Sequence, residues 1–153
     1  MTSEIKISQL VLPEQKDLAR DVAELVYTEV SRMEFKPNMF GKFLKYIRGD
    51  IVIVAQDSND LLVAAGIATP PETPRSKDAY IADLATVQSH RDRGVGRMVV
   101  GELERVAESM GAEMTTVLPL PASIGFYSRL GYEKYGEGMM AKRLSWLPRQ
   151  PNL

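Results

Sequence analysis

The sequence predicts a mixed α/β domain, because segments with strand character and segments with helical periodicity alternate along the chain. The clearest strand signal is 79–87 (AYIADLATV), which is apolar, rich in strand-forming residues and free of Gly and Pro. The clearest helix signal follows it, in apolar residues that share one helical face: Val95, Val99, Leu103, Val106 and Met110. A short glycine-bearing loop joins this strand directly to this helix.

One strand and two helices are expected at the start of the chain. A strand at 5–10 precedes a helix from Pro13 to about Val30, since proline is favoured in the first helical turn. Residues 38–48 predict a second helix, for which Asn38 is a suitable N-cap.

A β-hairpin is expected next, formed by 50–56 and 61–68. The intervening residues 57–60 (DSND) have the composition of a turn, and Gly66 inside the second strand suggests a bend or bulge. The segment 70–78 holds three prolines among polar residues and is predicted to be a loop.

The rest of the chain predicts a strand, a short helix and a final pair of strands. These lie at 112–118, 122–130, 132–135 and 139–144. The tail 145–153 contains Trp146, which can pack either on the domain or on a second subunit, so a homodimer is left open. The predicted order is β-α-α-β-β-β-α-β-α-β-β.

Length and composition favour one soluble domain over 1–153, with 44% hydrophobic and 25% charged residues. The formal net charge of −1 offers no field for nucleic acid, and no apolar run approaches the ~20 residues of a membrane span. The absence of cysteine excludes disulfides, thiolate metal sites and a cysteine nucleophile. With no signal-peptide pattern at the N-terminus, a cytoplasmic location is expected. The single histidine, His90, cannot form a histidine-rich metal site, and a surface or packing role is expected for it.

The loop Arg91-Asp92-Arg93-Gly94-Val95-Gly96 has the character of an anion site. The first N–H groups of a helix have no partner inside it and lie at the positive end of its dipole. Glycines expose such groups, and Arg91, Arg93 and Arg97 add positive charge. The sequence therefore predicts a phosphate or pyrophosphate site here, although a tight turn with solvated arginines remains the alternative for the hexapeptide alone.

Two motifs resemble the GNAT acetyltransferase superfamily. Arg91-x-x-Gly94-x-Gly96 is similar to the family's acyl-CoA pyrophosphate loop, [RQ]-x-x-G-x-[GA], and 126–132 (FYSRLGY) is similar to its F-Y-x-x-x-G-[FY] segment. The resemblance is clear over 79–144 and looser over 1–78. It implies a mostly antiparallel sheet splayed between two parallel strands, with helices on both faces. It also implies acetyl-CoA as co-substrate, an amine as acceptor and no metal.

The resemblance assigns cofactor contacts to this chain. Backbone groups of Leu84 and Thr86 would hold the pantetheine arm, and an N–H near Ala85 or Thr86 would polarise the thioester carbonyl. The pyrophosphate would lie on the backbone amides of 91–97, which comprise Arg91, Asp92, Arg93, Gly94, Val95, Gly96 and Arg97. Ser123 either contacts the cofactor or caps its helix.

The resemblance also suggests catalytic residues. Tyr127 would be the general acid that protonates the departing thiolate, since a phenol has a reference pKa of ~10. Asp83 is the one acid in an apolar strand, so it is the candidate base, with substrate binding, pairing to an arginine or a water chain as alternatives. Alternation places Asp83 and Leu84 on opposite faces. Tyr27, Glu29, Glu34 and Tyr46 fall in the region that lines the acceptor site in the family, and most are expected to be ordinary surface positions.

One position departs from the family pattern. Leu120 stands where the family commonly has Asn, which removes a hydrogen bond to the cofactor. Without a cysteine, direct attack in a ternary complex is expected. An acyl-CoA-binding module without transfer, or a dimerisation module that kept only the fold, are the alternatives to an N-acetyltransferase.

Overall fold

The computed structural model of the protein describes residues 4–72 and 77–144. The expectations for part of the loop 70–78 and for Trp146 concern residues outside this part of the chain. Within it the chain forms β1 (Lys6–Gln9), α1 (Lys16–Glu29), α2 (Phe40–Tyr46), β2 (Ile51–Gln56), β3 (Leu62–Thr69), β4 (Asp78–Thr86), α3 (Val95–Ser109), β5 (Met114–Val117), α4 (Ile124–Arg129), β6 (Glu133–Lys134) and β7 (Met140–Arg143). The predicted order of strands and helices is confirmed.

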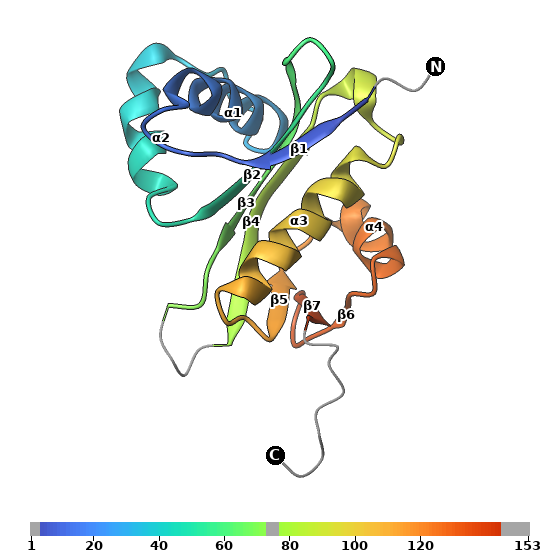
Figure 1. The fold of residues 1–153 in the computed structure, drawn as a ribbon. Helices are drawn as coiled ribbons and strands as arrows, with labels where there is room; N and C mark the ends of the chain where they lie inside the picture. The colour runs from blue at the N-terminus through green and yellow to red at the C-terminus, as the bar shows by residue number, and fades with distance from the viewer. Residues whose placement is uncertain (1–3, 73–76, 145–153) are drawn as a thin grey trace.

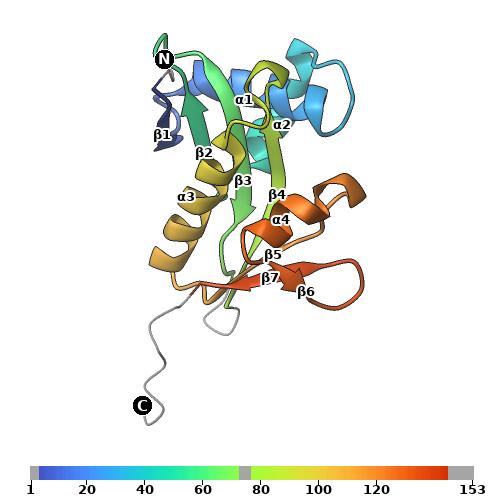
Figure 2. The same ribbon diagram turned by 90° about the vertical axis from the view of Figure 1, so that its right-hand side faces the viewer.

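The strands of the described residues form one mixed sheet in the order β1-β2-β3-β4-β5-β7-β6. Only β4 and β5 pair in parallel, and every other neighbouring pair is antiparallel. Helices cover both faces of this sheet, with α1 and α2 on one side and α3 on the other (Figures 1 and 2). The predicted fold class, a mostly antiparallel sheet with one parallel pair at its centre, is confirmed.

Two apolar layers hold the sheet between its helices. On the α3 side, Val99 and Leu103 are fully buried against residues of β2, β3 and β4. On the other side, Val22 of α1 and Phe43 of α2 are buried against the opposite face of the same strands. Each such side chain contributes about 1.5–3 kcal/mol relative to exposure, so both helical layers fix the central strands.

Gly66 of β3 permits the close approach of α3. A Cβ atom at this position would lie 2.8 Å from Leu103 Cδ1 and 2.8 Å from Val99 Cγ1. The irregularity expected at Gly66 lies one residue further on, between Ile67 and Ala68. There Ile67 pairs with Asp83 and Ala68 with Ile81, so β4 carries one extra residue, Ala82, as a β-bulge.

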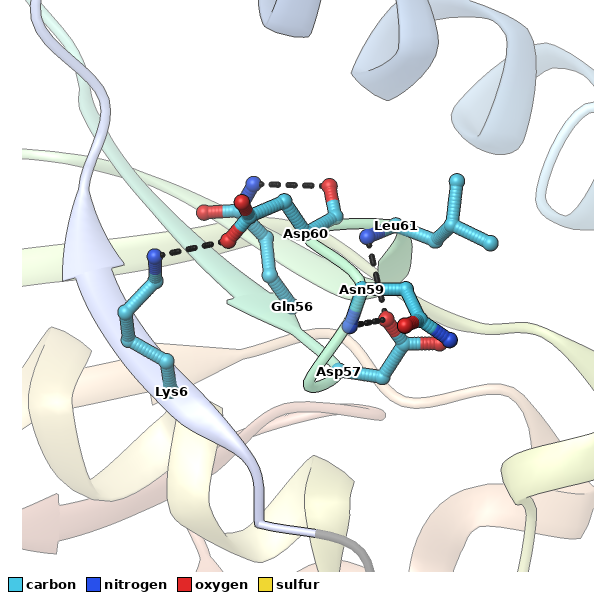
Figure 3. A network of polar contacts seen from close by, with 6 residues as sticks. All are labelled: Lys6, Gln56, Asp57, Asn59, Asp60 and Leu61. Atoms are coloured by element: carbon cyan, nitrogen blue, oxygen red, sulfur yellow. Dashed lines mark hydrogen bonds and ion pairs between the residues drawn. The ribbon is translucent and has the colours of Figure 1, made fainter.

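The predicted hairpin of β2 and β3 closes through a turn centred on Asp57 (Figure 3). Its Oδ1 accepts the N–H groups of Asn59 at 2.8 Å and Leu61 at 3.1 Å. Lys6 of β1 reaches Asp60 Oδ1 at 3.0 Å, so the edge strand is tied to the same turn. An aspartate that accepts nearby backbone N–H groups is a typical turn residue.

Two predicted helix starts are wrong. α1 begins at Lys16 rather than Pro13, and Pro13 lies in the preceding turn. Asn38 is not an N-cap, because it lies inside a 3₁₀ turn at Pro37–Met39 that leads into α2. None of the helices in the described ranges is long and apolar enough to cross a bilayer.

Candidate active site

The strands β4 and β5 part halfway along the sheet. They pair only from Asp78 to Ile81 on β4 and from Met114 to Val117 on β5. The bulge at Ala82 follows the last pair on β4, and Pro119 closely follows β5. Figure 2 shows β6 and β7 turned across the direction of β2 and β3. A cleft of about 1080 Å³ opens at this divergence, lined by both strands, the loop before α3, and α4.

The main chain of β4 presents an open edge to this cleft. Val87 N–H donates to Val63 O at 2.9 Å, and successive residues of a strand direct their backbone groups to alternate edges. Leu84 and Thr86 therefore direct theirs away from β3. In agreement, Thr86 O accepts a hydrogen bond from Arg91 Nε at 3.3 Å.

Nearly all of the residues expected at the site line the cleft. They are Asp83, Leu84, Thr86, Arg91, Asp92, Arg93, Gly94, Val95, Gly96, Arg97, Ser123 and Tyr127. Ala85 is the exception, because it pairs with Ala65 of β3 and is buried on the α1–α2 side of the sheet. The backbone of Thr86 thus fits the expected contact with a thioester better than that of Ala85.

The mouth of α3, by which we mean its N-terminal turn from Gly94 to Arg97, offers unpaired backbone N–H donors. Gly94 takes a left-handed conformation with φ of 80°, and Asp92 does the same with φ of 61°. The first bond within the helix runs from Met98 N–H to Gly94 O at 3.2 Å. Within the described residues, the N–H groups of Val95 and Gly96 have no hydrogen-bond partner. Such a succession of free amides at a helix start suits an anion.

The first residue of the loop differs from its neighbours. Arg91 N–H donates to Gln88 O at 3.3 Å, so this amide is already satisfied. The Arg91 guanidinium forms an ion pair with Glu29 at the end of α1, in addition to its bond to Thr86. Arg91 therefore fastens α1 to the end of β4. Arg93 and Arg97 are exposed at the cleft, and the described part of the chain gives neither an ion pair.

Gly96 keeps the helix mouth close to its neighbours. A Cβ there would lie 3.4 Å from Phe126 Cζ on α4 and 3.8 Å from Thr86 Oγ1 on β4. A larger side chain would have to occupy the cleft or displace Phe126. Because Gly96 has no side chain, the N-terminal turn of α3, α4 and the open edge of β4 can lie close together around the cleft.

Tyr127 lies at the buried end of the cleft with only 4% of its surface exposed. Its ring packs edge-to-face against Phe126 and Tyr132, with centroids 5.0 and 5.3 Å apart. Burial, aided by the nearby Tyr80, raises the pKa of Tyr127 to about 12. The described residues give its hydroxyl no hydrogen-bond partner. A phenol in this state is protonated at neutral pH and can donate its proton into the cleft.

A polar cluster secures Tyr132 behind Tyr127. The Tyr132 hydroxyl donates to Glu104 of α3 at 2.8 Å, and Lys142 of β7 reaches the same carboxylate at 3.1 Å. Burial and the Glu104 charge raise the pKa of Tyr132. This cluster ties α3 and β7 to the segment that follows α4.

Asp83 also lines the cleft, but it lies on the opposite face of β4 from Leu84. Leu84 packs toward α3, whereas Asp83 accepts a hydrogen bond from Tyr46 of α2 at 2.8 Å, so the predicted separation of the two faces holds. Burial raises the pKa of Asp83, and the Tyr46 bond opposes that rise. Within the described residues its partner is a tyrosine rather than an arginine. Sequence reasoning placed Tyr46 in this region without identifying this contact.

The sequence profile of the Acetyltransferase (GNAT) family matches residues 19–132, which is most of the chain. The chain belongs to the GNAT acetyltransferase family. No curated protein sequence matches it.

Solved GNAT structures share the fold at low sequence identity. An aminoglycoside 6′-N-acetyltransferase complexed with coenzyme A has a TM-score of 0.74 and 18% identity, over 91% of this chain and 97% of that one. A GNAT N-acetyltransferase (YhbS) from Escherichia coli in complex with CoA gives 0.69 and 19%, over 95% and 84%. A GNAT acetyltransferase from Brucella melitensis in complex with acetyl-CoA gives 0.67 and 14%, over 93% and 89%.

The β5 side of this GNAT cleft is apolar. Leu118 and Leu120 line it with 58% and 68% of their surfaces exposed. Leu120 therefore presents hydrocarbon where the family commonly presents an amide. Ser123 also lines the cleft; it occupies the N-cap position of α4 but makes no side-chain capping bond. His90 lies at the rim, with its Nδ1 3.0 Å from Ser89 Oγ.

Proposed function

We propose that the protein is an acetyl-CoA-dependent N-acetyltransferase that transfers the acetyl group to a primary amine by direct attack in a ternary complex. The supporting observation is the meeting of three features in one cleft. These are the free amides at the mouth of α3, the open edge of β4 and the buried phenol of Tyr127. Family membership supplies the class of reaction.

The residues present fit the parts of acetyl-CoA. The amides of Val95 and Gly96, with Arg93 and Arg97 nearby, would hold the diphosphate, because a helix mouth favours negative charge. The outward-facing main chain of Leu84 and Thr86 would pair with the amides of the pantetheine arm, as an added strand does. Within the described residues, no cluster of three or more His, Asp and Glu side chains is suited to a metal.

The chemical step needs two protons removed from the acceptor ammonium and one supplied to the leaving sulfur. Asp83 takes a proton from the acceptor ammonium, directly or through water, and the free amine attacks the acetyl carbonyl carbon. A backbone N–H of the open β4 edge stabilises the resulting oxyanion. The carbon–sulfur bond then breaks, and Tyr127 gives its proton to the thiolate. The attacking nitrogen gives up its second proton, which restores the phenol of Tyr127, and the neutral amide and CoA thiol are released.

Free CoA release with a panel of amines tests this proposal. Release that requires both acetyl-CoA and a small or peptidyl amine supports it, and mass spectrometry of the amine should show the added acetyl group. Acetyl-CoA binding without release for any amine would instead favour an acyl-CoA-binding module. Leu120 favours this second function, because its exposed hydrocarbon side chain cannot form a hydrogen bond to the cofactor.

A further inference from the structure

The carboxylate of Asp83 accepts a hydrogen bond from a residue that does not line the cleft. Tyr46 Oη donates to Asp83 Oδ2 at 2.8 Å. Asp83 lines the cleft, whereas Tyr46 does not, and 53% of the tyrosine surface faces solvent on the α2 side. Within the described residues, Asp83 Oδ1 has no hydrogen-bond partner. One oxygen is therefore held, and the other is available to a molecule in the cleft.

The packing of α2 sets the position of this phenol. Tyr46 is the last residue of the helix, and its ring lies 6.3 Å from that of Phe43, which is 1% exposed. Ile47, the next residue, is 3% exposed in the same core. Buried residues on both sides of Tyr46 thus fix the direction in which its hydroxyl leaves the helix.

The surroundings of Asp83 are acidic. Among the residues that the structure describes, Asp50 before β2, Glu72 after β3 and Tyr80 on β4 are the titratable groups around the Tyr46–Asp83 pair. Burial, then Asp83 and Glu72, raise the pKa of Asp50. Burial also raises the pKa of Asp83, and the hydrogen bond from Tyr46 lowers it. Glu29 and Arg32 line the same cleft from the end of α1 and the turn after it.

A neutral donor suits a carboxylate that must act on a cation. An arginine at the same place would neutralise Asp83 and occupy both of its oxygens. A phenol donates one hydrogen bond, which favours the ionised carboxylate and leaves its charge in place.

We infer that Tyr46 is a positioning residue for Asp83: its hydroxyl fixes Oδ2 so that the ionised Oδ1 meets the acceptor amine. This inference rests on the proposed amine transfer. Tyr46 does not line the cleft, so it acts only through the carboxylate.

The substitution Tyr46→Phe removes the hydroxyl and keeps the ring. Tyr27→Phe is the matched control, because Tyr27 packs in the same aromatic group, 5.6 Å from Phe35 and 6.3 Å from Phe43. Tyr27 does not line the cleft, and the described residues give its hydroxyl no partner. The thermal unfolding midpoint of each variant reports on folding, which the half-exposed position of Tyr46 should preserve.

Two readouts test the role. The first is the carboxyl ¹³C shift of Asp83 followed against pH by NMR, and the second is the pH profile of kcat/KM. Loss of a bond to the charged form raises the pKa of Asp83, so in Tyr46→Phe both the NMR titration and the acidic limb move to higher pH. The activity loss should be largest at the acidic end of the profile and smallest on the plateau. Tyr27→Phe should move neither.

The outcomes separate this inference from the proposed function. If the protein turns over amines but Tyr46→Phe leaves the acidic limb of the pH profile unmoved, the role of Tyr46 is overturned and the proposed function stands. A uniform loss across the whole pH range, with an unmoved NMR titration, assigns Tyr46 a structural role and also overturns it. A wild-type protein that acetylates no amine overturns the proposed function, and the positioning role with it.

Discussion

At Tyr127, burial and chemistry favour the same protonation state. The phenol is enclosed by Phe126 and Tyr132, and its pKa of about 12 keeps its proton in place at any pH where the fold would be assayed. A general acid must be protonated before it acts, and the raised pKa meets that condition, although it also makes the phenol a weaker acid toward a thiolate. The residue therefore needs no ionised neighbour to prepare it.

Tyr127→Phe tests this acid directly. We expect turnover to fall by about 10²–10⁴-fold, the usual contribution of general acid–base catalysis, with the affinity for acetyl-CoA nearly unchanged. In the wild type the raised pKa means that Tyr127 causes no descending limb below about pH 10. Steady-state kinetics and calorimetric titration with acetyl-CoA measure both quantities. Wild-type turnover in the variant would assign the acid to another group.

The sequence was informative about residues that belong to one continuous segment. The loop 91–97 and Tyr127 could be placed because their motifs are local. The Tyr46–Asp83 and Glu29–Arg91 contacts could not, since they join residues 37 and 62 positions apart. That Ala85 directs its backbone groups toward β3 rather than the cleft could not be predicted for a related reason. The direction in which β4 presents its backbone depends on its pairing with β3, including the bulge at Ala82.

Among the elements, α3 depends on two glycines for its placement. Gly66 lets the helix lie close to β3, and Gly94 lets the chain turn into it. The periodic apolar face predicted the helix and its extent well. The starts of α1 and α2 were predicted wrongly because proline and asparagine also favour turns, and tertiary packing decides between turn and helix.

Gly66→Ala should destabilise the fold by roughly 1–3 kcal/mol through overpacking, because its Cβ would meet Val99 and Leu103 at 2.8 Å. Gly101→Ala is the control within α3, where a Cβ meets nothing within 4 Å. That change should stabilise the helix by roughly 0.5–1 kcal/mol. Urea unfolding measures both. Equal effects would show that close approach at Gly66 is unimportant.

Gly94→Asp should weaken acetyl-CoA binding at least about tenfold, since a repulsion of only 1.4 kcal/mol has that effect. The new carboxylate would stand at the helix mouth, where the diphosphate is proposed to lie. Gly111→Asp provides the control, because Gly111 also has a positive φ and an open Cβ position but lies at the other end of α3. Calorimetric affinities compare the two. Equal affinities would move the diphosphate elsewhere.

For the molecule as a whole, the parallel ladder between β4 and β5 joins the two halves of the sheet. It spans four residues on each strand, and the segment from β5 to β7 is attached through it and through the Glu104 cluster. A ligand in the cleft would contact both sides of this connection. The family resemblance predicted the splayed strands, whereas the bulge that accompanies the splay is visible only in the register.

Acetyl-CoA should therefore stabilise the whole fold. At about 100 times its Kd, the linked gain in unfolding free energy is about 2.7 kcal/mol. For a chain of this size that corresponds to a rise of roughly 5–10 °C in the melting temperature. Differential scanning fluorimetry measures the shift. An unchanged melting temperature would contradict both transfer and acyl-CoA binding.

The open edge of β4 has a consequence for handling the protein. Unpaired backbone at a strand edge is a template on which another chain can add a strand. In protein kept without acetyl-CoA, the outward backbone groups of Leu84 would be free for such pairing between molecules. Concentrated stocks kept without the thioester should therefore form aggregates sooner than stocks saturated with it, and the same ligand that supplies the acetyl group would preserve solubility.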